Sequence, residues 1–263
     1  MSSNINIAVA GKGGTGKTSV ASLVIRYLLK NNLGTILAVD ADPNSNLAES
    51  LGLEVRQTVG RILNEFQGEK INIPAGMTKE AYLEYQLNVA LTESKGLDLV
   101  TMGRGEGPEC YCYPNVVIRK LIDDWSKNYA FVVMDNEAGL EHLSRRTTQN
   151  VDELLLVSNH SVKGLRAVAR VKELIKELKL NVKRESVIIN QVPNGEIDPL
   201  LSEEMERLGI TAAAVIPVDE DMLEFDLEQK PLFDLPDTSR AVTAVNQLMG
   251  ALLQHENIQA KRG

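Results

Sequence analysis

The sequence contains few of the residues that characterise secreted, membrane-spanning or nucleic-acid-binding proteins. Only two of its 263 residues are cysteine, which excludes a disulfide framework. Lys and Arg number 28 against 36 Asp and Glu, a net charge of −8, and this balance argues against a nucleic-acid partner. No apolar run approaches the roughly 20 residues of a membrane span, so we expect no membrane partner either.

Composition and length place the chain among ordinary globular proteins. Hydrophobic residues make up 43% and charged residues 24%, which argues against disorder or a coiled coil. We predict a single domain over residues 1–263, large enough to bury its own core. The first apolar run begins at Ile5, which leaves no room for a signal peptide, and we expect a cytoplasmic protein.

Apolar runs of strand character alternate along the chain with segments of helical periodicity. This alternation predicts right-handed βαβ units, and therefore an α/β fold with a mainly parallel sheet of about seven strands and helices on both faces. The expected strands are 5–9, 35–39, 97–102, 131–134, 153–157, 187–189 and 212–216.

The helical segments follow from the 3.6-residue period of their apolar positions. In the first helix, the residues expected on the buried face are Val20, Leu23, Val24, Tyr27 and Leu28. Residues 54–97 are predicted to form a helical insertion packed on the core, and a short helix ending at Leu51 is expected to begin with Ser45 as its N-cap. The expected helices are 17–31, 59–66, 79–91, 116–125, 162–178 and 240–254.

A glycine-rich stretch joins the first strand to the first helix and has the spacing G-x-x-x-x-G-K-[ST]. Glycines let backbone N–H groups point at phosphate oxygens, and the helix adds the positive end of its dipole. Lys17 would reach the β- and γ-phosphates, and the Thr18 hydroxyl would ligate Mg²⁺. The alternative is a glycine-rich turn without function. The predicted phosphate-binding residues are Gly11, Lys12, Gly13, Gly14, Thr15, Gly16, Lys17, Thr18 and Ser19.

The glycine-rich stretch contains a second lysine, Lys12, which is not part of the general phosphate-loop pattern. Gly-Lys-Gly-Gly-x-Gly-Lys-Thr resembles the deviant Walker A loop of the ATPase superfamily that includes the nitrogenase iron protein, MinD, ParA and the arsenite-pump ATPase. The resemblance implies hydrolysis of ATP to ADP and phosphate in a nucleotide-dependent homodimer, in which Lys12 crosses the interface to the partner's nucleotide. The alternative reading of Lys12 is a solvated surface lysine.

Carboxylates follow two of the predicted strands, at the edge of the sheet where α/β folds bind ligands. Asp135 closes strand 131–134 as a Walker B aspartate does and would orient water on Mg²⁺, and Asp40 is placed near the same ion. Asp42 matches the switch I aspartate that orients the attacking water in the relatives named above. Each aspartate could instead cap a loop or a helix.

Two further segments resemble the base-binding elements of that superfamily. Asn190, at the end of a predicted strand, resembles the asparagine that contacts adenine, since its amide can donate and accept hydrogen bonds at once. Pro217, Val218 and Asp219 resemble the loop that lines the other edge of the base. The alternative for Asn190 is a polar residue in a turn.

The two cysteines stand two residues apart, as Cys110-x-Cys112. This spacing would strain a disulfide, and two thiolates are only half of a four-ligand metal site. A symmetric dimer would bring four sulfurs together, in tetrahedral geometry for Zn²⁺ or square-planar geometry for Ni²⁺. Two small buried hydrophobic residues are the alternative. His142 and His160 could add metal ligands, although a lone histidine is more often a polar loop or core residue.

Five motifs in one order make the resemblance more specific. The deviant loop, Val-Asp-Ala-Asp-Pro-Asn, Cys-Tyr-Cys, Met-Asp-Asn-Glu-Ala-Gly-Leu-Glu-His-Leu and Ile-Asn-Gln-Val occur as in CooC-type ATPases and the similar AcsF type. The resemblance implies nickel binding at the cysteines and ATP-dependent delivery of nickel to carbon monoxide dehydrogenase or acetyl-CoA synthase. The alternatives are an electron-transfer ATPase with a subunit-bridging iron–sulfur cluster, and a positioning ATPase like MinD or ParA.

Overall fold

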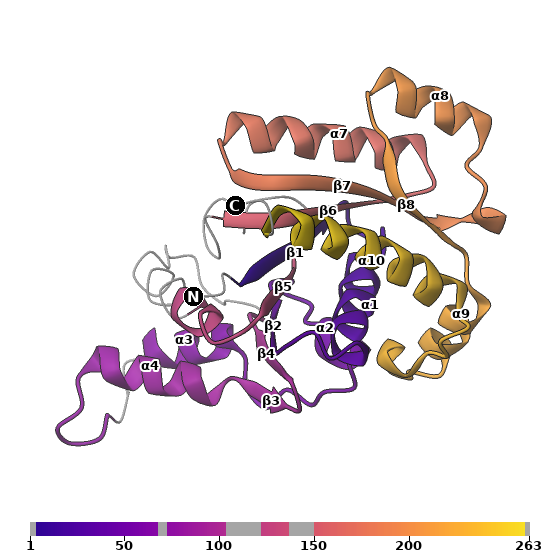
Figure 1. Cartoon of the computed structure of the whole chain (residues 1–263). Coiled ribbons are helices and arrows are strands. Elements are labelled where there is room, and N and C mark those ends of the chain that lie inside the picture. The colour runs from indigo at the N-terminus through magenta and orange to yellow at the C-terminus, as the bar shows by residue number, and fades with distance from the viewer. Residues whose placement is uncertain (1–3, 68–72, 104–121, 137–149, 261–263) are drawn as a thin grey trace.

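The structure, a computed structural model, describes residues 4–67, 73–103, 122–136 and 150–260. These residues form an eight-stranded sheet in the order β3-β4-β2-β5-β1-β6-β7-β8 (Figure 1). Every neighbouring pair is parallel except β3 with β4. The strands are β1 (Ile5–Gly11), β2 (Ile36–Asp40), β3 (Thr92–Ser94), β4 (Leu97–Thr101), β5 (Phe131–Asp135), β6 (Asn150–Asn159), β7 (Asn181–Val192) and β8 (Ala212–Pro217).

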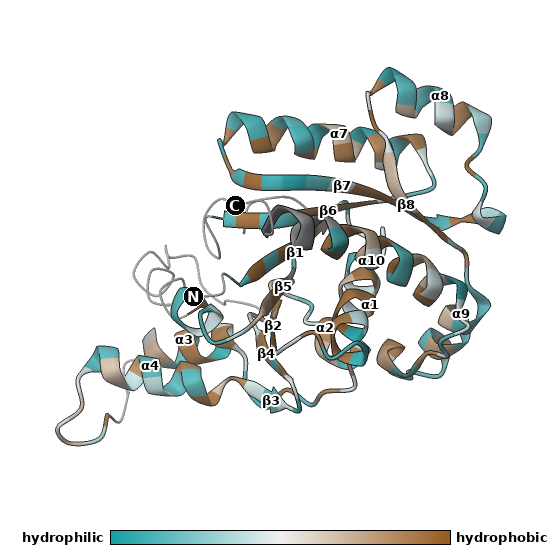
Figure 2. Ribbon diagram, viewed as in Figure 1, coloured by the Kyte–Doolittle hydropathy of each residue, from teal (hydrophilic) through white to brown (hydrophobic). Residues whose placement is uncertain are grey.

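Helices cover both faces of this sheet (Figures 1 and 2). None of the described helices contains a stretch that is long and apolar enough to cross a bilayer. Residues 122–126 are also helical. The named helices are α1 (Lys17–Lys30), α2 (Leu47–Ser50), α3 (Val59–Gln67), α4 (Lys79–Val89), α7 (Val162–Glu177), α8 (Pro199–Arg207), α9 (Glu220–Leu227) and α10 (Arg240–Ala260), with short 3₁₀ turns η1 (Pro193–Gly195) and η2 (Leu232–Asp234).

The core consists of two hydrophobic clusters, one on each face of the sheet. Ile7 and Val9 of β1 face the cluster that contains α1, α2 and α10, whereas Ala8 and Ala10 face the cluster that contains α3, α4, α7 and α8. This alternation is the two-residue period of a strand, and both faces must be apolar because both are covered. Much of β1 and β5 is accordingly brown in Figure 2.

The predicted fold class is confirmed, and the differences lie in single elements. The sheet has eight strands rather than about seven, because the three-residue strand β3 pairs antiparallel with β4 within the segment that we expected to be helical. Three residues are too few to show a period, so local sequence does not reveal such a strand. The prediction of one domain over the whole chain stays a prediction.

Helices α8 and α9 were not predicted, although both begin with recognisable N-cap residues. Asp198 accepts a hydrogen bond from the Leu200 backbone N–H ahead of α8, and Asp219 accepts one from the Asp221 N–H ahead of α9. Both are aspartates followed by Pro or by acidic residues, the composition expected of a first helical turn. The composition of these segments was therefore informative where their periodicity was weak.

The buried surface of α1 also exceeds the single face that was predicted. Ser22, Ile25 and Arg26 are buried along with the expected apolar residues, except that Tyr27 is only partly buried. The reason is long-range, because α10 and the segment around η2 cover the side of α1 that faces away from the sheet. Helical periodicity reports one apolar stripe, and it does not reveal a polar side chain buried by a distant segment.

Candidate functional site

The predicted site residues converge at the carboxyl edge of the sheet. Strand β5 lies between β1 and β2, and Asp40 and Asp135 occupy neighbouring positions at the ends of β2 and β5. The glycine-rich loop leaves the end of β1, the next strand in the sheet, and enters α1. The parallel topology thus brings together three segments that are far apart in sequence, at the edge where such sheets bind ligands.

Two glycines of the loop sit where no side chain fits. Gly11 has a φ of +156°, and a Cβ there would lie 2.2 Å from the Val157 carbonyl oxygen. Gly16 has a φ of +86°, and a Cβ there would lie 2.2 Å from the Asn190 side-chain nitrogen. The loop is therefore packed against β6 and β7 at two points, and glycine is required at both.

The start of α1 leaves its backbone N–H groups available for an anion. Gly16 is the N-cap and provides no side-chain hydrogen bond, and the first turn, which includes Thr18 and Ser19, contains no acidic residue. The helix dipole and the uncovered N–H groups both attract negative charge at this end. A phosphate group would satisfy these donors.

The side chain of Lys17 packs against the loop. It is 7% exposed, and its Nζ donates a hydrogen bond to the Lys12 backbone oxygen over 3.4 Å. The same oxygen accepts a hydrogen bond from the Thr15 hydroxyl over 2.9 Å. Lys12, Gly13 and Gly14 are exposed at the outer side of the loop. The loop therefore presents one lysine inward and the other outward.

Asp135 and Asp40 form a buried acidic pair next to Thr18. Asp135 Oδ2 accepts a hydrogen bond from the Thr18 hydroxyl over 2.6 Å, and its Oδ1 has no partner among the described residues. Burial, together with the neighbouring charge of Asp135, raises the pKa of Asp40 to about 7. Burial raises the pKa of Asp135 to about 6, while the Thr18 hydrogen bond and Lys17 oppose that rise. Close buried carboxylates with a spare oxygen are suited to a divalent cation.

Within the described part of the chain, no three His, Cys, Asp or Glu side chains gather into a metal site of their own. Mg²⁺ in a nucleotide site does not require three protein ligands, because that ion keeps several waters and is held by one or two carboxylates and the substrate phosphates. The donor set of Thr18, Asp40 and Asp135 provides two carboxylates.

Asp40 also has a structural role that corrects one sequence expectation. Its Oδ2 accepts a hydrogen bond from the backbone N–H of Leu47, the first residue of α2, over 3.1 Å, and its Oδ1 accepts one from the Asp42 N–H over 3.1 Å. Ser45, the expected N-cap, instead has a φ of +58° in the preceding turn. A residue seven positions upstream caps the helix because the chain turns back on itself after β2.

Asp42 lies half-buried in that turn. Its Oδ1 accepts a hydrogen bond from the Asn44 N–H over 2.8 Å. Its charge also makes a minor contribution to the raised pKa values of Asp40 and Asp135, so Asp42 lies within electrostatic range of both carboxyl groups. The alternative reading of Asp42, an aspartate that caps a loop, is therefore present, and its role toward the attacking water stays a prediction.

Asn190 contacts the phosphate loop. It is 5% exposed, and its Nδ2 donates a hydrogen bond to the Thr15 carbonyl oxygen over 2.9 Å. The next residue, Gln191, has a φ of +57°, and the pairing of β7 with β8 becomes irregular there. The amide of Asn190 thus links β7 to the loop, and its contact with a base stays a prediction.

A recess of about 540 Å³ lies beyond Asn190, at the ends of β7 and β8. Asp219 lies on its wall, yet its carboxylate is occupied: Oδ2 accepts hydrogen bonds from the Ser239 hydroxyl and the Ala241 N–H, over 2.7 and 2.8 Å. Asp219 therefore caps both α9 and α10 and gives the recess its shape. Its lining includes Asn194, Val218, Asp219, Glu220, Thr238 and Arg240.

The comparisons with known proteins agree with this geometry. The family model of the CobQ/CobB/MinD/ParA nucleotide binding domain matches residues 7–232. The chain belongs to this family. It is therefore an α/β P-loop ATPase of the MinD/ParA type, and its glycine-rich loop follows β1.

Three proteins of known sequence or structure are similar to this chain over most of its length. An uncharacterized ATP-binding protein of Methanocaldococcus jannaschii is 44% identical over 92% of this chain and 96% of its own. The carbon monoxide dehydrogenase accessory protein CooC of Rhodospirillum rubrum is 25% identical over 95% of this chain and 97% of its own. The MinD structure from Pyrococcus horikoshii, complexed with Mg-ADP, superposes with a TM-score of 0.68 at 22% identity, over 98% of this chain and 100% of that one.

Of the two cysteines predicted to bind nickel or zinc and the two histidines that could add ligands, only His160 belongs to the described residues. Cys110, Cys112 and His142 lie outside the described residues. His160 is described, and its Nε2 accepts a hydrogen bond from the Asp198 backbone N–H over 3.1 Å. That contact occupies one of its two ring nitrogens at the start of α8.

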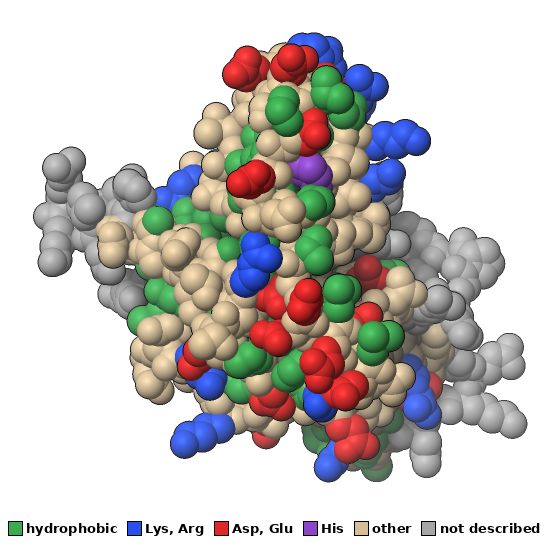
Figure 3. Space-filling model, turned by 90° about the vertical axis from the view of Figure 1, so that its right-hand side faces the viewer, with side chains coloured by type: hydrophobic (Ala, Val, Ile, Leu, Met, Phe, Trp, Pro, Cys, Tyr) green, Lys and Arg blue, Asp and Glu red, His purple; other side chains and the backbone are tan. Residues whose placement is uncertain are grey.

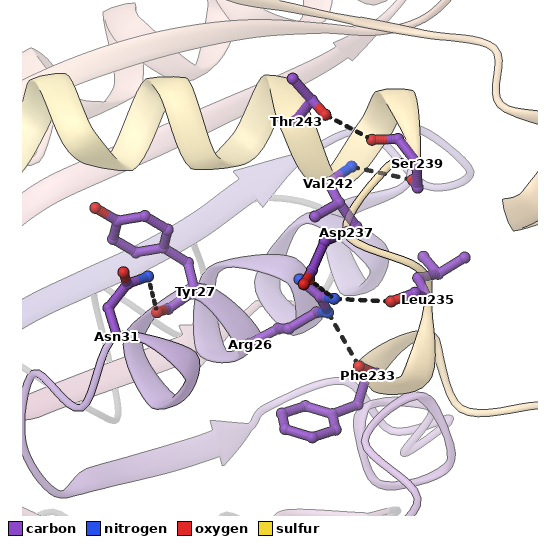
Figure 4. Close-up of polar contacts among 9 residues, drawn as sticks. All are labelled: Arg26, Tyr27, Asn31, Phe233, Leu235, Asp237, Ser239, Val242 and Thr243. Carbon is purple, nitrogen blue, oxygen red and sulfur yellow. Dashed lines mark hydrogen bonds and ion pairs between the residues drawn. The ribbon is translucent and has the colours of Figure 1, made fainter.

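Sequence reasoning missed a buried arginine in α1 (Figure 4). Arg26 of α1 is 2% exposed and donates hydrogen bonds to the carbonyl oxygens of Phe233 and Leu235, over 3.0 and 2.7 Å. It also pairs with the exposed Asp237 over 2.6 Å. These contacts fasten α1 to the segment that leads to Ser239 and the wall of the recess. No local signal distinguishes Arg26 from a surface arginine.

Proposed function

We propose that this ATPase is an ATP-dependent metallochaperone that carries nickel. The observation that carries the proposal is the meeting of Lys17, Thr18, Asp40 and Asp135 at one edge of the sheet, in a chain that also contains a Cys-x-Cys pair. The first half of this combination is the machinery of nucleotide hydrolysis. The second half is a pair of thiolates, which supplies two of the four ligands of a tetrahedral or square-planar metal site.

In this proposal, ATP binds with its phosphates in the loop and its base in the recess beyond Asn190. The N–H groups at the start of α1 and the Lys17 ammonium take the β- and γ-phosphates, because both provide positive charge on a preformed surface. Asn190 then either keeps its bond to Thr15 or exchanges it for the base. Val218, Asp219 and Pro217 shape the other side of the recess.

Thr18, Asp40 and Asp135 would hold Mg²⁺, directly or through water. The bound ion would supply positive charge that neutralises the phosphates and the acidic pair. Asp42 would accept a hydrogen bond from the attacking water and orient it toward the γ-phosphate. Lys12, exposed on the outer side of the loop, would contact the nucleotide of a second subunit and so make dimerisation depend on ATP.

The cargo in this proposal is Ni²⁺, with Zn²⁺ as the other candidate ion. Cys110 and Cys112 of each subunit would give four sulfurs at the two-fold axis of the dimer. The client would be carbon monoxide dehydrogenase or acetyl-CoA synthase. Support comes from the sequence spacing of the cysteines and from the likeness to CooC over nearly the whole chain. Hydrolysis would loosen the dimer and release the metal.

The decisive measurement is metal content together with native mass, in ADP and in a non-hydrolysable ATP analogue. We expect about one Ni²⁺ per dimer with the ATP analogue, following the four-ligand requirement. Cys110→Ser should abolish this metal binding, whereas Tyr111→Phe, a change between the two cysteines that leaves both thiols, should retain it. Unchanged metal binding in Cys110→Ser would refute the nickel role. It would not affect the assignment of ATPase activity, which is tested separately. Iron and absorption near 400 nm in an anaerobic preparation would instead indicate a cluster.

The ATPase part is tested separately. Lys17→Ala should lower ATP hydrolysis by about 10²-fold or more, because it removes the charge aimed at the phosphates. The matched control is Lys30→Ala, at the far end of the same helix. Equal activity in the two variants would contradict the placement of the nucleotide.

A further inference from the structure

Helix α9 is held to the protein by only one side. Its residues Met222 and Phe225 pack partly buried against the core cluster around α1 and α10, and none of its eight residues is fully buried. The opposite side of α9 looks outward on the face shown in Figure 3, where acidic and hydrophobic side chains are interspersed.

Two leucines on the outward side of α9 expose more than half of their surface to solvent. Leu223 is 56% exposed and Leu227 is 85% exposed, and Val218 just before the helix is 38% exposed. Residues four apart lie next to each other on a helix surface, so Leu223 and Leu227 form one apolar stripe. A single exposed leucine is ordinary, but a stripe of this kind at the rim of a recess is typical of an interaction surface.

The leucine stripe is flanked by acidic side chains. Glu220, Glu224, Asp226 and Glu228 are all exposed, and no Lys or Arg occurs between Val218 and Gln229. The next cation, Lys230, pairs with Glu228 and lies over the Phe225 ring. Arg240 of α10 also reaches this surface, where its Nη1 donates a hydrogen bond to the Val218 carbonyl oxygen over 3.5 Å. The outward side of α9 therefore combines an apolar stripe with more exposed carboxylates than cations.

We propose that this outward side of α9, defined by Val218, Leu223, Leu227, Glu220 and Glu224, docks a basic amphipathic helical segment of another protein. The leucines would pack against an apolar face of that segment, and its Lys or Arg side chains would pair with the flanking carboxylates. The inference goes beyond the proposed function and does not depend on nickel or on hydrolysis.

Charge decides between this occupant and the others. Nucleic acid and anionic membranes carry the same sign as this surface and would be repelled. A second copy of the chain has a net charge of −8. The arginines of its helix α7 already form ion pairs within the same chain, Arg170 with Glu173 and Arg166 with Glu204. A basic segment from a different chain complements the surface best.

The test uses the intact protein and a fluorescent helical peptide of about 18 residues, five turns, with leucines on one face and lysines on the other. The comparison peptide has glutamates in place of the lysines. Binding is followed by fluorescence anisotropy at low and at raised salt. We expect the lysine peptide to bind with an affinity that falls as salt rises, and the glutamate peptide not to bind.

Variants then locate the bound peptide. Leu223→Ser combined with Leu227→Ser, and separately Glu220→Gln combined with Glu224→Gln, should each weaken binding by about tenfold or more. The control is Leu200→Ser combined with Glu203→Gln on α8, where a leucine that is 72% exposed also stands beside an exposed glutamate. It should change binding by less than about twofold.

Several results would overturn the proposal. These are no binding of the lysine peptide, equal losses in the α8 control, or full binding in the leucine variant, which would indicate charge attraction alone. Self-association of the chain, or pelleting with anionic vesicles, that disappears in the leucine variant would assign the surface to another occupant.

Discussion

Replacing Arg26 with methionine should markedly destabilise the protein, although Arg26 lies outside the nucleotide loop. The guanidinium is buried and provides the hydrogen bonds to the Phe233 and Leu235 carbonyl oxygens. Methionine fills a similar volume but donates nothing, so two acceptors lose their partner. A buried polar group left without a hydrogen bond costs about 1–3 kcal/mol, so for two carbonyl groups we expect a loss of about 2–6 kcal/mol in the free energy of unfolding.

The ion pair of Arg26 with Asp237 adds little to this figure, because the Asp237 side chain is 76% exposed and solvent screens the pair. Arg26→Lys should be intermediate, because a lysine keeps the charge but lacks the planar fork that reaches two carbonyl groups. The comparison with these variants separates the loss of hydrogen bonds from the loss of charge.

The assay is equilibrium unfolding in urea followed by circular dichroism, with the midpoint and the slope compared between variants. Arg61→Met is the matched control, because Arg61 is 68% exposed and pairs with Glu65 on the surface of α3. It should cost about 0.5 kcal/mol or less. If Arg26→Met unfolds at the same midpoint as Arg61→Met, the contacts of Arg26 do not stabilise the fold and the reasoning fails.

Two further predictions concern the loop and the recess. Gly14→Ala should cost about 1–2 kcal/mol from its φ of +77° alone, since nothing lies within 4 Å of the added Cβ. Gly16→Ala should cost more, because it also displaces the Asn190 amide; equal losses in thermal or urea unfolding would contradict this packing. Asp219→Asn tests a pH dependence. Burial raises the pKa of Asp219, but the hydrogen bonds from Ala241, Ser239 and Asp221 outweigh it and lower the pKa below 3.8. The carboxylate therefore stabilises the protein above that pH and loses this effect as the pH falls through the folded value. Asp219→Asn should accordingly cost more stability at about pH 7 than at about pH 3, and an equal cost at both would refute the assignment.

Residue patterns were sufficient to predict the elements that have a strong local signal. Strands β1, β2 and β5 are short apolar runs, and α1, α7 and α10 show clear helical periodicity, so their existence followed from the sequence. Asp40, Asp135, Lys17 and Thr18 could be nominated because they stand at the ends of such runs or in a spaced motif. Strand β3 and helices α8 and α9 have weaker patterns and were missed.

The alternation of apolar runs and helical periodicity was sufficient to predict the fold class, and the resemblance of the loop to the deviant Walker A loop indicated the family. The tertiary structure decided what each nominated residue contacts. It placed Asp40 beside Asp135 across neighbouring strands, and it turned Asn190 toward Thr15. It also buried Arg26 under a segment more than two hundred positions away. Such contacts depend on strand order and helix packing, which join distant segments and leave no trace in the local sequence.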